Sequence, residues 1–381
     1  MILNNLKMAL AGHTVNIRIK DGKITQVLPH PIHDTKEEFT LTFDRAIIFP
    51  GLINSHDHLD FNLFPALGNQ TYNNYTEWGR HIHKTYKESI NSILKIPEVL
   101  REQWGVYKNL LCGVTTVVNH GKKIKKQSWP INVYEECQNI HSVQFERKWK
   151  LSLNNPFKKR LPVVVHVGEG IDESSFKEID RLTNWNLLKR PLIGVHGVAM
   201  NETQVQAFKA LIWCPESNYF LLNKTAPVNR LKKHTTILFG TDSTLTGRWN
   251  IWEHIRLARK TKFLADEELY DTLTGNAAFT WGTNSGTIAE GKDADLVVAK
   301  MKYDTPSESF FSIDPQDIML VIHQGKISLF DEELYTQLKG IDLDDYSRTY
   351  IDGTCKYVQG NLPGLMYKIR QFYPEAHFPV L

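Results

Sequence analysis

The sequence contains no C-x-x-C pair, and its four cysteines, Cys112, Cys137, Cys214 and Cys355, lie far apart. Isolated cysteines predict neither a disulfide framework nor a zinc finger, and they fit a reducing compartment. The chain also lacks an apolar run near the ~18 residues of a membrane span, and its N-terminus lacks the pattern of a secretory signal. We therefore expect a soluble, cytoplasmic protein with no membrane partner.

An excess of charge of one sign is absent as well. The 45 Lys and Arg residues nearly balance the 42 Asp and Glu residues, which leaves a formal net charge of +3. The basic runs are short and lack interleaved aromatic residues, so a solvated surface explains them better than nucleic-acid binding does. We expect no nucleic-acid partner, and a homo-oligomer is compatible with this composition.

The chain divides into two β-rich ends around a different middle. Residues 1–49 alternate apolar and polar positions around the turn signal Asp21-Gly22, and residues 284–335 return to a β-type pattern. Residues 50–283 alternate strand-like runs with amphipathic stretches, which is typical of βα units. We predict an α/β protein with a (β/α)8 TIM-type barrel over 50–283, a small β-sandwich made from both β-rich ends, and a C-terminal segment, 336–381, packed on the barrel.

Six apolar runs in the middle segment are predicted strands: GLINSH, VTTVVNH, LPVVVHV, LIGVHGV, ALIWCP and TILFGTD. Between Val118 and Pro162 only NIHSVQF and WKLSLN resemble strands, so either the third and fourth barrel units are abbreviated or the barrel is irregular. NETQVQAFKA and EHIRLARKTKF are predicted helices. The terminal segment is expected to contain two further helices.

Two histidines stand one residue apart at the end of the first of these runs. Side chains at positions i and i+2 of a strand point to the same face, so His56 and His58 project together while Asp57 points away. Two imidazoles on one side can chelate a metal ion. The carboxyl ends of barrel strands form the face that carries active sites. Two surface histidines are the simpler alternative for this short motif.

Three more predicted strands end in residues suited to a metal: His166 in VVVHVGEG, His196 in LIGVHGV and Asp242 in LFGTDS. Neutral imidazoles together with a carboxylate suit one divalent ion, with Zn2+ expected and Fe2+ as the alternative. Taken singly, each residue is better explained as a satisfied buried histidine or a capping aspartate. Their joint occurrence at strand ends favours the metal site.

Glu169 lies three residues after His166, between Gly168 and Gly170. These glycines permit a sharp turn over the barrel mouth, which would bring the carboxylate near the metal. A glutamate in that place, shielded from solvent, suits a proton shuttle. The alternative role is an acid that favours the N-terminal dipole of the helix that follows.

Together these pieces resemble the amidohydrolase superfamily, and in particular its mononuclear-metal branch with guanine deaminase, S-adenosylhomocysteine deaminase and the s-triazine hydrolases. The resemblance covers most of the chain, in the family's order. It rests on DGKI, FPGLINSHDH, GVTTVV, HVGEG, VHGV, CPESNYFLL, FGTDS, TGNAAFTWG and GTIAEGKDADLVV.

The resemblance implies a role for each matching residue. The metal ligands that it implies are His56, His58, His166 and Asp242. It also implies that Glu169 shuttles protons, that His196 contacts the attacking water or the substrate, and that Asp242 is both ligand and base.

The residues predicted to bind substrate rest on less specific motifs. In CPESN, Ser217 and Asn218 resemble residues that shape the pocket edge, although a turn and a helix cap explain them equally well. Trp78 is kept where the branch has a tryptophan, but the arginine that often precedes it there is absent. Trp78, Tyr72 and Tyr75 could stack a flat heterocycle, or they could pack against the barrel.

The expected function is hydrolysis at a carbon bonded to nitrogen, most simply the deamination of a small heterocyclic substrate by a metal-activated water. One alternative is a ring-opening amidohydrolase with two metals and a modified lysine, for which Lys148 and Lys150 are placed near a fourth strand. A catalytically inactive scaffold is the third hypothesis. The nucleic-acid deaminase motif, H-x-E followed by P-C-x-x-C, is absent, which excludes that zinc-deaminase fold.

Overall fold

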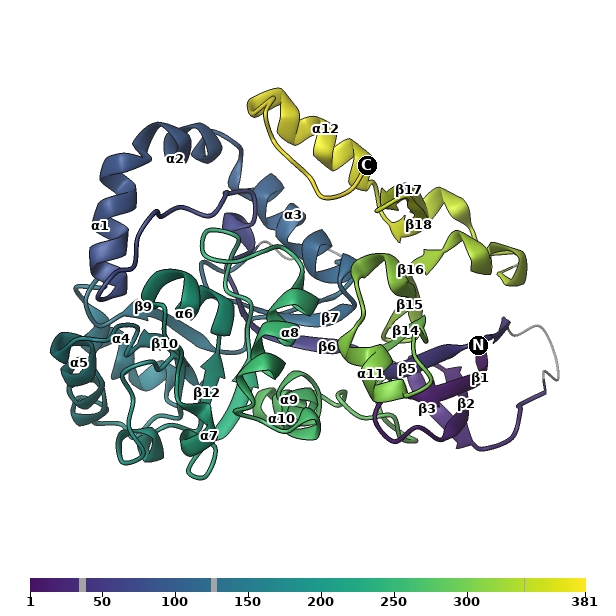
Figure 1. Cartoon of the computed structure of the whole chain (residues 1–381), viewed down its shortest axis with the longest axis horizontal. Coiled ribbons are helices and arrows are strands. Elements are labelled where there is room, and N and C mark those ends of the chain that lie inside the picture. Colours follow the sequence, from purple (N-terminus) through teal and green to yellow (C-terminus); the bar gives the residue numbers. More distant parts are fainter. Residues whose placement is uncertain (34–38, 125–128, 339) are drawn as a thin grey trace.

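The computed structural model describes residues 1–33, 39–124, 129–338 and 340–381 (Figure 1). Both chain ends contribute to one large sheet, and the middle of the chain forms two parallel sheets. The molecule is therefore a mixed α/β fold, as predicted. Within these described ranges, no helix is long and apolar enough to cross a membrane.

The large sheet joins the β-rich ends through the antiparallel pairing of β5 with β14. The hairpin predicted at Asp21 and Gly22 connects β2 and β3, and both turn residues have the positive φ that a tight hairpin requires, 51° and 76°. In sheet order the strands are β17 (Tyr346–Ile351), β18 (Thr354–Gln359), β16 (Lys326–Asp331), β15 (Ile318–His323), β14 (Leu296–Lys300), β5 (Ala46–Pro50), β1 (Ile2–Met8), β2 (Thr14–Lys20) and β3 (Lys23–Leu28), and β4 (Thr40–Thr42) also pairs with β1.

All six strands predicted in the middle segment are present, and their residues are almost entirely buried. Parallel sheets are covered on both faces, which explains why these runs are continuous in Val, Ile and Leu. One sheet contains β6 (Leu52–Asp57), β7 (Val114–Asn119) and β8 (Asn132–Tyr134). The other contains β9 (Gln138–Ser142), β10 (Val163–Val167), β11 (Leu192–His196), β12 (Ala210–Trp213) and β13 (Thr236–Phe239).

Backbone hydrogen bonds join the two parallel sheets at one edge. Backbone N–H groups of Thr241 and Asp242, just past β13, donate to the carbonyl of His56 in β6, each over 3.1 Å. At the other edge, β8 pairs with β7 and β9 pairs with β10, and only three residues separate β8 from β9. A parallel crossover needs a dozen or more residues, so no βα unit fits between β8 and β9.

The helices cover the outside of these sheets, and Figure 1 shows α12 beside α3, in agreement with their contacts. They are α1 (Tyr75–Thr85), α2 (Lys87–Leu94), α3 (Glu98–Leu111), α4 (Trp149–Leu153), α5 (Glu173–Asn184), α6 (Pro215–Leu222), α7 (Val228–Leu231), α8 (Ile251–Thr261), α9 (Asp266–Leu273), α10 (Gly275–Trp281), α11 (Pro306–Phe311) and α12 (Leu362–Phe372). Short 3-10 helices are η1 (Leu59–Phe61), η2 (Pro156–Lys158), η3 (Gln204–Ala207), η4 (Pro315–Asp317), η5 (Glu332–Gln337) and η6 (Leu343–Asp345).

Three local predictions need correction. WKLSLN is helix α4, because its buried residues Trp149 and Leu153 follow a helical spacing of four. NETQVQAFKA holds only the 3-10 helix η3, and its last residue, Ala210, begins β12. Among the described residues of the terminal segment, α12 is the only α-helix where two helices were expected, and the strands β17 and β18 also lie there. The helix predicted in EHIRLARKTKF is confirmed as α8.

Candidate metal centre and active site

The polar residues predicted at strand ends come together at one end of the parallel sheets. His56 lies in β6, His58 directly follows it, His166 lies in β10 and His196 ends β11. Asp242 follows β13 by three residues. All five side chains are buried. Strands far apart in sequence therefore present their metal-suited residues to a single point, as parallel strands of this fold do.

Nε2 of His166 and Oδ1 of Asp242 each lie close to the two histidine donors of the H-D-H motif. The Nε2 atom of His166 lies 3.2 Å from Nε2 of His56 and 3.3 Å from Nε2 of His58. The Oδ1 atom of Asp242 lies 3.7 Å and 3.6 Å from the same two histidine atoms. Ligand atoms bound to one ion at about 2.1 Å lie roughly 3–4 Å from one another. These residues fit a divalent metal ion.

Burial favours the neutral form of two of these histidines, His58 and His166. The Nδ1–H group of His166 donates to the backbone carbonyl of His141 over 2.7 Å, which leaves the lone pair of Nε2 facing the other donors. Burial lowers the pKa of His58 to about 3, and it holds the pKa of His166 well below its ordinary value. Neutral imidazoles are the ligand form of histidine.

Asp242 is held in place on its other oxygen. The hydroxyl groups of Ser217 and Thr246 donate to Oδ2 over 2.8 Å and 3.0 Å. Burial alone would raise the pKa of Asp242, but the neighbouring imidazoles of His56 and His58 outweigh it and hold that pKa well below its ordinary value. Asp242 has φ 57°, and His196 has φ 72°. Such left-handed conformations cost energy in non-glycine residues and are concentrated at functional sites.

Glu169 lies beside this centre as a buried carboxyl. Burial, followed by the charges of Asp242 and Glu178, raises its pKa well above the ordinary value, which favours the protonated form of the side chain. Its Oε2 atom lies 3.5 Å from Nε2 of His196. Helix α5 begins only at Glu173 and is capped by Asp172, so Glu169 does not belong to its first turn.

The glycines around Glu169 are required by close packing. Gly168 has φ 64°, which favours glycine. A Cβ atom on Gly170 would lie 2.0 Å from Oγ of Ser175 and 2.8 Å from Cβ of Asn74. The loop that carries Glu169 is thereby pressed between the start of α1 and the start of α5.

A chain of hydrogen bonds orients His196. The indole N–H of Trp213 donates to Oγ1 of Thr225 over 2.6 Å, and that hydroxyl donates to Oδ1 of Asn218 over 3.2 Å. The amide of Asn218 is therefore free to donate to Nδ1 of His196, at 2.9 Å. This pattern assigns the proton of His196 to Nε2, on the side of Glu169.

Ser217 and Asn218 thus contact Asp242 and His196 rather than the cavity. Both are fully buried on α6, and neither lines the cavity described below. Their predicted role in substrate binding stays a prediction, and their contacts are those of positioning residues.

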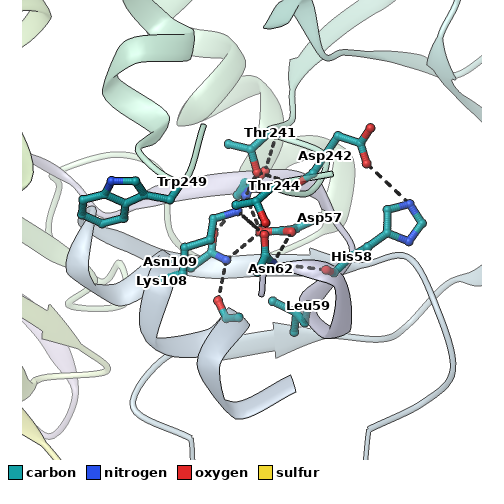
Figure 2. Close-up of polar contacts among 12 residues, drawn as sticks. Asp57, His58, Leu59, Asn62, Lys108, Asn109, Thr241, Asp242, Thr244 and Trp249 are labelled. Carbon is teal, nitrogen blue, oxygen red and sulfur yellow. Dashed lines mark hydrogen bonds and ion pairs between the residues drawn. The ribbon is translucent and has the colours of Figure 1, made fainter. Parts of the chain in front are cut away.

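Asp57, the middle residue of the H-D-H motif, points away from the donors, as the strand alternation predicted. Figure 2 shows its carboxylate on the opposite side of the chain from His58. There it accepts hydrogen bonds from Lys108 over 3.0 Å, from Asn109 over 2.8 Å and from Asn62 over 2.8 Å. Asp57 and Lys108 are both fully buried. This network fixes the backbone from which His56 and His58 project.

A cavity of ≈ 710 Å³ opens onto the centre. Its floor includes His58, His166, Glu169, His196 and Asp242. Most of its wall is apolar or aromatic, and the aromatic residues are Phe61, Phe64, Tyr75, Trp78 and Phe145.

The predicted aromatic residues divide between wall and core. Trp78 and Tyr75 line the cavity, and the indole N–H of Trp78 donates to the carbonyl of Leu67 over 2.6 Å. Tyr72 does not line it and belongs to a small hydrophobic cluster with Val198, Leu221 and Leu222. Of the three, only Trp78 and Tyr75 can touch a bound molecule directly.

Sequence reasoning missed three residues at this centre. His120 directly follows β7 and, with His56 and His166, forms a group whose donor atoms all lie within 4.8 Å of one another. His141 in β9 lines the cavity, and Thr246 binds Asp242. His120 ends the predicted strand VTTVVNH, so its position at a strand end was the signal that could have identified it.

The lysines considered for a two-metal site lie elsewhere. Lys148 is exposed at the start of α4, and the ammonium group of Lys150 lies 3.7 Å from the ring centre of Trp185. Lys150 is therefore engaged in a cation–π contact away from the donors.

Comparison with known proteins bears on this site. A model of the amidohydrolase family matches residues 154–328, which include His166, Glu169, His196 and Asp242. The resemblance to the amidohydrolase superfamily is confirmed. The chain is 22% identical to a 5-methylthioadenosine/S-adenosylhomocysteine deaminase of Caldanaerobacter subterraneus, over 88% of this chain and 91% of that relative.

Two solved structures share the fold. One is an adenosine deaminase from Xanthomonas campestris with bound zinc, at a TM-score of 0.72 and 16% identity over 98% of each chain. The other is an atrazine chlorohydrolase from Arthrobacter aurescens in complex with zinc, at a TM-score of 0.70 and 14% identity over 97% of this chain and 99% of the other.

Proposed function

We propose that the chain is a metal-dependent hydrolase that removes an amino group, as ammonia, from a nitrogen heterocycle. The observation that carries this proposal is the convergence of His56, His58, His166 and Asp242 beside the buried acid Glu169, at the floor of an apolar cavity. The match to the amidohydrolase family and the deaminase relative support the class of reaction.

One divalent ion per chain is proposed, with zinc first and ferrous iron as the alternative. His56, His58, His166 and Asp242 would hold it, and the zinc in both similar structures supports this choice. Such an ion, when bound, is a Lewis acid that lowers the pKa of a water molecule toward about 7.

The residues of the chain then move the protons. The carboxylate of Asp242, whose pKa is low, accepts a proton from the attacking water. Glu169, whose raised pKa favours the protonated form, donates its proton to the ring nitrogen next to the carbon under attack. It then takes the proton that Asp242 accepted from the water and passes it to the leaving amine. The proton of the new hydroxyl group returns to Glu169 as the carbonyl group forms. A C–O bond forms, the C–N bond breaks, and ammonia leaves a carbonyl group behind. His196 donates a hydrogen bond that stabilises the developing charge.

The cavity supports a flat, largely apolar substrate. Trp78 and Tyr75 offer aromatic faces for stacking, and the remaining wall is mostly apolar. Ring opening of a cyclic amide at a two-metal site is the weaker hypothesis. Such a site needs a lysine among the donors, whereas the ammonium group of Lys150 makes a cation–π contact with Trp185. An inactive scaffold would have no use for a buried acid beside a complete donor set.

We also propose that β6 to β13 form a closed TIM-type barrel in which β8 and β9 together replace two units. The hydrogen bonds from Thr241 and Asp242 to β6, and the bond over 3.0 Å from Asn139 of β9 to the carbonyl of Asn119 in β7, support closure on both sides. Domain boundaries near residues 50 and 284, a β-sandwich form of the companion domain and a cytoplasmic location belong to this proposal.

Ammonia release from a panel of amino-heterocycles tests the proposed reaction. Zinc-loaded protein is incubated with purines, pyrimidines, adenosine-like thioethers, triazines and pterins. We expect ammonia from at least one class, at a rate that falls when the metal is removed by a chelator. Ring opening or halide release without ammonia would contradict deamination, and no turnover of any kind would favour the scaffold.

Glu169→Gln tests the proton shuttle. The variant keeps the size of the side chain and removes its proton, so we expect bound zinc to stay stoichiometric and kcat to fall about 10²–10⁴-fold. Glu173→Gln, the same change on the exposed first turn of α5, is the matched control and should leave kcat unchanged. An unaltered rate in Glu169→Gln would refute the shuttle.

A further inference from the structure

His120 occupies a place that the proposed metal site leaves unexplained. It follows the last residue of β7, and its backbone N–H donates to the carbonyl of Asp57 over 2.8 Å, between the two histidines of the H-D-H motif. Its ring centre lies 4.3 Å from that of His166, 5.1 Å from that of His56 and 5.3 Å from that of His58. The imidazole is thus packed against all three histidine donors.

Among the residues that the structure describes, neither ring nitrogen of His120 has a hydrogen-bond partner, although only 3% of the residue is exposed. A buried polar atom without a partner is costly, so an imidazole with two such atoms is expected to have a partner of another kind. His120 does not line the cavity, which separates its nitrogens from a bound substrate. One nitrogen belongs to the donor group formed with His56 and His166.

We propose that His120 is a fourth imidazole donor of the metal centre, supplied by β7. The inference rests on the metal site of the proposed function, but it does not depend on the reaction catalysed there. A set of four imidazoles and one carboxylate suits a zinc ion that can expand from four to five ligands, and it also suits Fe2+, Co2+ or Ni2+.

A set of this size has a consequence for metal binding. An additional neutral imidazole raises the affinity for a divalent ion without changing the net charge of the ligand set. It also explains why the ring of His120 has no hydrogen-bond partner within the described part of the chain. A merely structural core histidine would satisfy at least one nitrogen within the protein, as His254 does by bonding to the carbonyl of Arg248 over 2.8 Å.

X-ray absorption of the zinc-loaded, full-length protein counts the imidazoles directly. We expect scattering from four histidine rings in the native chain and from three in His120→Asn. Because this measurement on the native chain needs no variant, the proposal stays testable even if a variant folds poorly. Three rings in the native protein would overturn it.

Metal affinity provides a second measurement. Competition with a chromogenic chelator should show zinc bound at least about tenfold more weakly by His120→Asn than by the native chain. The visible spectrum of the Co2+-loaded protein should change as a ligand is lost. His120→Phe, which fills the same space without nitrogens, should show the same two effects and a smaller rise of Tm on adding zinc.

His141→Asn is the matched control, because His141 is a neighbouring histidine whose side chain stands outside the donor groups. It should leave zinc affinity and the Co2+ spectrum as in the native chain. If His120→Asn behaves like this control, His120 is not a ligand. If four imidazoles are counted but no ammonia is released, the proposed reaction is rejected and the assignment of His120 as a ligand stands.

Discussion

At the scale of single residues, Asp57, the middle residue of the H-D-H motif, stabilises the backbone that carries the two proposed histidine ligands. Asp57 carries a negative charge with no exposure to water, and its carboxylate is surrounded by Lys108, Asn109, Asn62 and Asn54. An isolated buried charge is costly, so the ion pair with Lys108 and the amide bonds belong together. The two histidines project from a backbone that this cluster immobilises.

Lys108→Met should therefore destabilise the protein by about 3–5 kcal/mol, because it leaves the charge of Asp57 buried without its ion pair. Urea unfolding of the zinc-loaded protein measures the change in free energy. The double variant Asp57→Asn with Lys108→Met should recover part of the loss. Lys177→Met, which breaks the exposed pair with Glu173 on α5, should leave the midpoint unchanged. Equal midpoints for both lysine variants would refute the importance of the buried pair.

At the scale of elements, α5 is tied to α1 and to the loop after β10 through a buried carboxyl. Glu178 is 2% exposed, its Oε1 accepts from the backbone N–H of Gly168 over 2.7 Å, and its Oε2 accepts from the hydroxyl of Tyr75 over 3.3 Å. Burial raises the pKa of Glu178 to about 7. The loop that holds Glu169 therefore rests on a group that titrates near neutrality.

This raised pKa predicts a pH dependence of stability. The folded chain binds the proton of Glu178 more tightly than the unfolded chain does, so its contribution is complete below the ordinary pKa of about 4.5 and is lost as the pH rises through about 7. The loss amounts to about 3 kcal/mol.

Urea unfolding of native protein and Glu178→Gln at pH 5 and pH 8 isolates that contribution. We expect the native chain to lose more stability than the variant between these two pH values. Glu173→Gln, on the exposed side of the same helix, should follow the native chain. Parallel curves for native protein and Glu178→Gln would contradict the assigned shift.

At the scale of the whole molecule, the C-terminal segment completes the large sheet. The ammonium group of Lys356 in β18 is fully buried and donates to Asp331 of β16 over 2.6 Å and to the carbonyls of Gln316 and Ile318 over 2.7 Å and 2.6 Å. Beyond it, Phe378 packs edge-on against Trp104 of α3, with ring centres 4.7 Å apart. The end of the chain thus joins the large sheet to the parallel sheets.

Ending the chain at residue 340 should consequently lower the urea midpoint sharply or make the protein insoluble, since it removes β17, β18 and α12 and leaves Asp331 without its ion pair. Lys356→Met separates the contribution of the charge from that of packing, and it should cost about 3–5 kcal/mol. A truncated chain with the native midpoint would show that the segment is dispensable.

The fold was largely predictable where the pattern is local. Runs of a few residues predicted six buried strands, helix α8 and the hairpin at Asp21-Gly22. The motifs in these runs then indicated the family that the chain resembles. Segments whose apolar residues fit both a strand and a helix were mispredicted. The sequence of α4 was predicted as a strand because apolar residues are frequent in it, yet Trp149 and Leu153 are buried on one face of a helix. Tertiary burial, absent from the sequence pattern, decides such cases.

By itself the sequence determined that His56 and His58 share a face and that Asp57 turns away, because a strand alternates side chains with a period of two. Only the tertiary structure decided which distant groups meet them. His120, Lys108 and Asn218 lie tens of residues from their partners in sequence. Their contacts exist because parallel strands bring their carboxyl ends to one place, and no local pattern encodes which neighbour each strand receives.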